Sequence, residues 1–135
     1  MAMSIINNIC RSFISFFWSR FIAPPTITNT KRVQIPVKIR NMTWAAYHGN
    51  NKRGVCYACG KNIDCENWHC SHVISDNANG IINVSNLRTC CPHCNLSCGK
   101  QNLYAFIRDK NLKGPGSRNV NAYMRNNPDQ INSSR

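Results

Sequence analysis

Two Cys-x-x-Cys pairs carry the clearest chemical signal in the sequence. They are Cys56 with Cys59 and Cys91 with Cys94. Each pair presents two thiolates from one turn, and two such pairs complete the tetrahedral shell of a structural Zn²⁺ ion. Cys90 and His93 have the same spacing as the second pair, so a Cys-His register remains open. The spacing favours the four-cysteine zinc site, which would contribute folding free energy directly to a small domain.

Histidine and asparagine side chains near these pairs are suited to phosphodiester hydrolysis. This reaction needs a base that titrates near neutrality, and His72 supplies an imidazole. It also needs a divalent cation to polarise the phosphate, and hard ions such as Mg²⁺ prefer oxygen ligands. Asn95 offers a carboxamide oxygen for that cation. Asn86 could hydrogen-bond the loop backbone and hold the loop in place.

The segments "SHVIS", "NLRTC" and "CNLSCGK" resemble the HNH endonuclease family, particularly HNH proteins of large DNA viruses. His72, Asn86 and Asn95 keep the family's intervals of about fourteen and nine residues. The resemblance covers roughly residues 35–108. It implies an α+β fold of the ββα-metal type, in which two strands and a helix follow one another. It also implies cleavage of DNA with Mg²⁺ or Mn²⁺, with 5′-phosphate and 3′-hydroxyl ends as products.

One position departs from the family pattern. The residue before the base histidine is usually an acidic or histidine metal ligand, whereas this chain has Ser71. His69 lies two residues earlier, on the same face of an extended strand, and could take over the ligand role. A catalytically degenerate HNH module that binds DNA without cutting it is therefore the rival interpretation.

The charge of the chain points to an anionic partner. The 135 residues carry a net charge of +12 with only five acidic side chains, and none of these precedes Asp64. Such a field attracts polyanions, so we expect DNA to bind, largely through its phosphate backbone. The candidate contacts are basic residues in and before the motif region: Lys38, Arg40, Lys52, Arg53 and Arg88.

The cysteine count bears on the compartment. Nine cysteines, an odd number with most of them in close pairs, favour metal binding over a secreted disulfide scaffold. The expected location is an intracellular reducing compartment, the cytoplasm or the nucleus, including that of a virus-infected host cell.

Residues 1–25 form a distinct amphipathic segment whose apolar residues recur at helical spacing. The segment is too short, and with Arg11 and Arg20 too charged, to span a bilayer. Three interpretations remain open. The segment could pack on the domain or on a protein partner, lie in a membrane interface as part of a membrane- or virion-associated structural protein, or act as a targeting signal. A basic linker is expected over 26–34.

The remaining chain is expected to hold the HNH-like domain over 35–108 and a polar, flexible tail over 109–135. Apolar spacing predicts a helix from about 36 to 48, with Ile39, Met42 and Ala46 on its apolar face. Strands are predicted over 67–74 and 86–90, around an Asn- and Gly-containing loop. A single helix is predicted from about 93 to 108. Its residues available for burial are Leu96, Leu103, Phe106 and Ile107.

Overall fold

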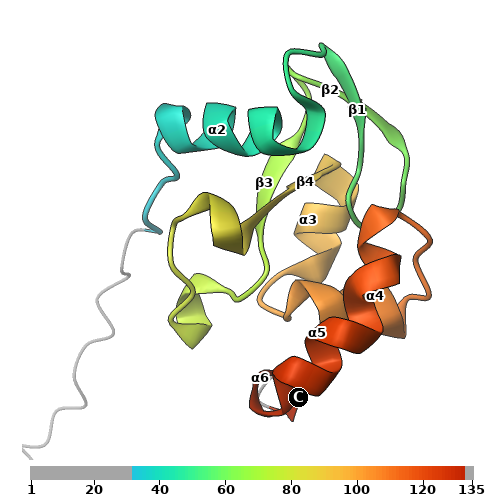
Figure 1. The fold of residues 1–135 in the computed structure, drawn as a ribbon. Coiled ribbons are helices and arrows are strands. Elements are labelled where there is room, and N and C mark those ends of the chain that lie inside the picture. Colours follow the sequence, from blue (N-terminus) through green and yellow to red (C-terminus); the bar gives the residue numbers. More distant parts are fainter. Residues whose placement is uncertain (1–31, 133–135) are drawn as a thin grey trace, which may run out of the picture. The chain divides into compact units, whose positions relative to one another are not determined.

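The computed structural model describes residues 32–132, which combine short helices with two small antiparallel sheets (Figure 1). The fold class is therefore α+β, as the sequence predicts. The predictions for residues 1–25 and most of the 26–34 linker lie outside the described residues. Within 32–132, no helix is long and apolar enough to cross a membrane.

Helix α2 (Val37–His48) opens the described fold. Pro36 precedes it, where a missing N–H costs no helical hydrogen bond, and Gly49 ends it with a φ of 59°. Its buried residues are Thr43 and Trp44, with Ile39 packed partly against the core. Met42 and Ala46 are exposed, so the predicted apolar face was wrong for both. Trp44 is buried because its ring packs 5.3 Å from that of Trp68.

A hairpin precedes the central sheet. Strands β1 (Arg53–Val55) and β2 (Asn62–Asp64) pair antiparallel, with Gly54 opposite Ile63. Position 54 requires glycine, because atoms of the His48 ring lie 2.6 Å from the place that a Cβ atom would occupy. The tight turn between the two strands carries the first cysteine pair.

The central sheet consists of β3 (His69–His72) and β4 (Leu87–Cys90), and α3 (Pro92–Cys98) follows directly. The register places His69 opposite Cys90 and His72 opposite Leu87. Both strands lie within the predicted ranges but are shorter. Helix α2 covers one face of this sheet and α3 contacts β3 from the other (Figure 1). Neighbouring strand residues point to opposite faces, so one set of side chains faces α2 and the other set faces α3.

The single helix predicted over 93–108 is in fact two helices, α3 and α4 (Leu103–Asp109). Gly99 ends α3 with a φ of 57°. Asn102 then starts α4, because its side-chain oxygen accepts hydrogen bonds from the amides of Tyr104 and Ala105. Three of the four apolar residues expected to be buried lie in α4 and are buried, whereas Leu96 in α3 is 73% exposed.

The chain after Asp109 differs from the expected flexible tail over 109–135. It forms the short helical turn η3 (Pro115–Asn119) and helices α5 (Val120–Asn126) and α6 (Pro128–Asn132). The amides of Gly114 and Gly116 donate to carbonyls of the first cysteine turn, and Val120 is buried. The polar composition of this segment gave no signal for these backbone contacts, because they depend on a distant turn of the chain.

Candidate metal centre and active site

Four cysteines from two distant segments meet at one point. The sulfur atoms of Cys56, Cys59, Cys91 and Cys94 all lie within 4.8 Å of one another. The Sγ atoms of Cys59 and Cys91 are 3.9 Å apart. In a tetrahedral zinc-thiolate site with Zn–S bonds of about 2.3 Å, neighbouring sulfurs are separated by about 3.8 Å. The cluster therefore has the donor set and the spacing to hold a metal ion such as Zn²⁺.

Each half of the cluster is positioned by a local turn. In the first, the Gly60 amide donates to the Cys56 carbonyl, which closes the loop between β1 and β2. In the second, Cys91 caps α3 and its sulfur accepts from the Cys94 amide at 3.4 Å. The alternative pair is not in the cluster: Cys90 is fully buried in the core and His93 is exposed on α3.

Electrostatics oppose the gathering of four bare thiolates. A hydrogen bond with the Cys90 thiol lowers the pKa of Cys56 to about 4. Burial raises the pKa of Cys59 and, more strongly, that of Cys94. A divalent cation would reverse the shifts at Cys59 and Cys94, because it stabilises the thiolate form of its ligands. The arrangement thus fits a cation better than four free thiols.

Of the three candidate ligands for a catalytic cation, Asn95, His69 and Ser71, the first two are in contact. His69 of β3 and Asn95 of α3 are joined by a hydrogen bond of 3.1 Å between Nδ1 and Nδ2. Asn95 follows the cluster residue Cys94 directly, so the cysteine cluster and this contact share the first turns of α3. The contact fixes the side chain of Asn95 against strand β3.

Asn86 holds the loop between β3 and β4. Its side-chain oxygen accepts from the Ile74 amide at 2.9 Å. Its side-chain nitrogen donates to the carbonyls of Ile74 and Ile81, both at 3.0 Å. Asn86 is buried, so these groups have little access to water that could replace the bonds. The Asn86 side chain thus hydrogen-bonds the loop backbone beyond His72, which is the contact predicted for it, and backbone hydrogen bonds within the loop add to it.

His72 and Ser71 lie at the end of β3 with different surroundings. His72 is half-buried and pairs with Leu87, while Ser71 is 2% exposed and pairs with Arg88. Among residues 32–132, the four cysteines are the only group of three or more His, Cys, Asp or Glu side chains placed to hold a metal ion. A cation at Asn95 would thus have few charged protein ligands.

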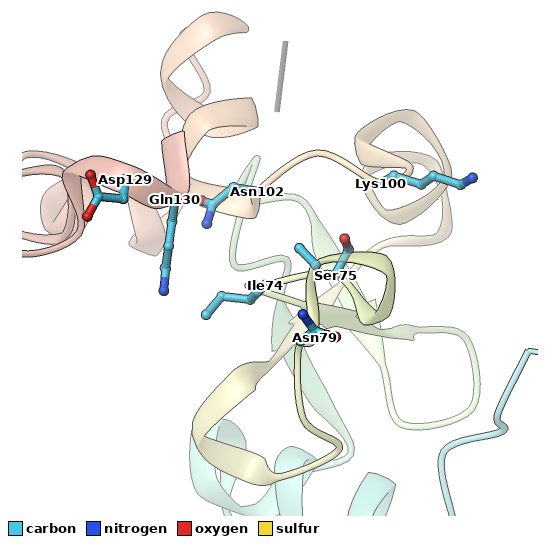
Figure 2. A pocket seen from close by; sticks show the side chains of 8 residues that line it. Ile74, Ser75, Asn79, Lys100, Asn102, Asp129 and Gln130 are labelled. Atoms are coloured by element: carbon cyan, nitrogen blue, oxygen red, sulfur yellow. The ribbon is translucent and has the colours of Figure 1, made fainter. Parts of the chain in front are cut away.

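A hollow of about 280 Å³ lies beside the held loop (Figure 2). Ser75 and Asn79 line it from the loop, and Asp129 and Gln130 line it from α6. Lys100 also lines it, but its side chain extends away from Asp129 and Gln130.

The five candidate DNA contacts fall into two groups. Lys38, Lys52 and Arg53 are exposed, as phosphate contacts require. The other two pack on aromatic rings. Arg40 lies 5.3 Å from the ring centre of Trp68. Arg88 lies between Tyr47 and Tyr57, at 5.7 and 5.4 Å, and donates to the carbonyls of Ser85 and Leu87.

No role was predicted from the sequence for Tyr47 and Tyr57, because they lie in separate segments with no common spacing. Tyr57 and Tyr104 share a hydrogen bond of 2.8 Å between their hydroxyls, and Tyr104 stacks on Tyr123. Arg88 is thus part of a tyrosine cluster that joins the sheet to the C-terminal helices, a structural role that the sequence did not suggest.

No family model, curated protein or solved structure matches this chain.

Proposed function

We propose that β3, β4 and α3 form a ββα-metal module of the HNH type that hydrolyses DNA phosphodiester bonds. The observation that carries the proposal is the hydrogen bond of 3.1 Å between His69 and Asn95. This bond holds the Asn95 side chain of α3 against strand β3. It uses the amide nitrogen and leaves the amide oxygen of Asn95 for a hard cation. The strand–strand–helix order and the held loop support the same assignment.

Each residue then has a separate task. His72 accepts the proton of the attacking water. A bound Mg²⁺ or Mn²⁺ would polarise the phosphate and stabilise the leaving 3′ oxygen. Asn95 would hold that cation, with His69 orienting Asn95 and with Ser71 or water completing the shell. Asn86 keeps the loop after His72 in one conformation, so the base stays aligned with the phosphate.

The cysteine cluster is proposed to bind a structural Zn²⁺ ion. Its second pair forms the start of α3, so zinc would fix the helix that carries Asn95. Zinc bound by cysteine thiolates agrees with residence in a reducing compartment, the cytoplasm or nucleus. A membrane or protein contact through residues 1–25 stays a separate proposal.

A second candidate function is DNA binding without cleavage. Ser71 favours it, because a neutral hydroxyl that is only 2% exposed is a weak ligand for a hard cation. The basic surface would serve this function equally well, because phosphate contacts need charge and not a catalytic metal.

Nicking of a supercoiled plasmid with Mg²⁺ or Mn²⁺ tests the proposal. We expect the wild-type protein to nick and His72→Ala to lose about 10²–10⁴-fold in rate while still binding DNA. His93→Ala is the matched control for the loss of an imidazole, since His93 is exposed and has no proposed part in proton transfer or metal binding. If the wild-type protein binds DNA but stays inert with both metals, the cleavage proposal fails and the second candidate replaces it.

A further inference from the structure

Leu96 is the most exposed large apolar side chain in the described residues, at 73%. A single exposed leucine is ordinary on a protein surface, so its meaning depends on its surroundings. Leu96 comes directly after Asn95, whose side chain contacts His69. It therefore lies on the solvent side of α3, beside the proposed cleavage site.

The face around Leu96 is polar and cationic. His93 and Ser97 are exposed and lie three residues before and one residue after Leu96, so all three share the outer face of the helix. Lys100 follows at the end of α3, where its side chain extends away from Asp129 (Figure 2). The apolar tip of Leu96 thus has cationic or polar neighbours along the helix.

The acidic side chains near the C-terminal end of α3 are Asp109, which accepts a hydrogen bond from Gln101, and Asp129, which lines the same hollow as Lys100. No acidic residue occurs between Asp76 and Asp109. A hollow of about 480 Å³ on the flank of α3 is lined by Lys61, Lys110 and Ser97, with no carboxylate among its lining residues. Within residues 32–132, neither of these lysines forms an ion pair. An exposed apolar side chain on a helix that also carries basic side chains complements duplex DNA, whose phosphates flank stacked bases.

We propose that Leu96 inserts against the bases of bound DNA and partly unstacks one base step next to the scissile phosphate. Apolar side chains that enter a base step offset the cost of unstacking with the contacts that the bent DNA makes. The preferred substrates are then duplexes with easily unstacked steps, such as TA or CA/TG, or with a mismatch. This inference rests on the proposed DNA-binding function and adds a determinant of where the protein acts.

The test uses the full zinc-loaded chain and duplexes with 2-aminopurine at successive positions, without Mg²⁺, so that binding is seen without cleavage. With wild-type protein, we expect fluorescence to rise at one step near the cut. Leu96→Ser should abolish the rise and weaken binding about tenfold, whereas Leu96→Met should keep both. The salt dependence of binding should not change, because the phosphate contacts remain. A mismatch at the same step should restore most of the lost affinity.

Val37→Ser is the matched control, because Val37 is 72% exposed but lies on α2. It should leave the fluorescence rise unchanged. If Leu96→Ser keeps the rise, the affinity and the nicking rate, the inference is overturned while wild-type nicking still supports the proposed function. A change in oligomeric mass with unchanged DNA signals would likewise overturn it and assign Leu96 to self-association. If the wild-type protein neither binds nor cuts DNA, the proposed function fails first.

Discussion

The amide of Asn95 lies 3.1 Å from Nδ1 of His69 and so joins helix α3 to strand β3. An amide nitrogen can only donate, so Nδ1 accepts and the ring carries its proton on Nε2. Under the proposed function, His69 in this tautomer would orient Asn95, and water or Ser71 would complete the cation's ligands. Orienting partners of metal ligands typically contribute about 10- to 100-fold to metal affinity.

The first prediction follows from this contact. His69→Ala should raise the Mg²⁺ concentration for half-maximal nicking by about 10- to 100-fold, with the maximal rate largely kept. Asn95→Ala should remove metal-dependent nicking, because the ligand itself is lost. Metal titrations of the nicking rate measure both effects. An unchanged metal requirement in His69→Ala would show that the contact does not position Asn95.

The second prediction concerns the cysteine cluster. Elemental analysis of protein purified under reducing conditions should give one zinc per chain. Cys56→Ser or Cys91→Ser should lose the metal and unfold, since structural zinc supplies folding free energy. Cys65→Ser is the control, because Cys65 is an exposed thiol outside the cluster, and it should keep zinc and circular dichroism. Zinc retained in Cys91→Ser but lost in Cys90→Ser would instead indicate the shifted register.

A third prediction isolates the loop. Asn86→Ala removes three part-buried side-chain hydrogen bonds, two of them to the backbone of Ile74. The free energy of unfolding should fall by about 1–3 kcal/mol, and the Ile74 amide should exchange faster with solvent. Urea unfolding and hydrogen exchange measure these changes. Asn83→Ala is the control, since Asn83 makes an exposed hydrogen bond to the Ser85 amide and should cost less.

Ser71→Asp gives the fourth prediction. Ser71 is buried, so a carboxylate there is costly unless a cation compensates its charge. Without divalent metal, the variant should be less stable than the wild-type protein. Mg²⁺ or Mn²⁺ should restore stability, and nicking should start at lower metal concentration. Melting temperatures with and without metal provide the measurement, and a variant that metal does not stabilise would argue against a cation site at this end of β3.

The fifth prediction concerns DNA affinity. Lys52 and Arg53 are exposed, and losing two phosphate contacts should make the slope of log K against log salt shallower by about 1.8. Fluorescence anisotropy at several salt concentrations measures the slope for Lys52→Ala with Arg53→Ala. Arg88→Ala is the contrast, because Arg88 packs on Tyr47 and Tyr57 and should lower stability without changing the slope. An unchanged slope in the double variant would place the DNA on another face.

Local signals in the sequence predicted the elements that depend on spacing. The two Cys-x-x-Cys pairs predicted the cluster, and Pro36 with Gly49 bounded helix α2 closely. Errors occurred where distant segments decide the outcome. Met42 has the right helical spacing for burial but is exposed. Thr43 and Trp44 are buried instead, and the Trp44 ring packs on that of Trp68. Side-chain partners such as Asn95 for His69 required the folded register and could not be derived from spacing.

The helical region after the cluster shows a second kind of error. Apolar residues continue at helical spacing from Leu96 to Ile107, which favoured one long helix. The positive φ of Gly99 and the capping oxygen of Asn102 divide it, so Leu96 and Leu103 belong to separate helices and have opposite burial. Gly99 and Asn102 were the available signals, and their capping chemistry outweighs the apolar period.

Cys91 and Cys94 bracket the first turn of α3, and this arrangement sets the rotational phase of the whole helix. With both cysteines bound to one metal ion, α3 could not turn about its own axis. Each residue of a helix advances that phase by about 100°. One residue inserted between Cys94 and Asn95 would therefore leave all four sulfurs in place but swing the amide away from His69. A metal bound to the cluster would therefore set the rotation of α3 about its axis as well as the position of its first turn.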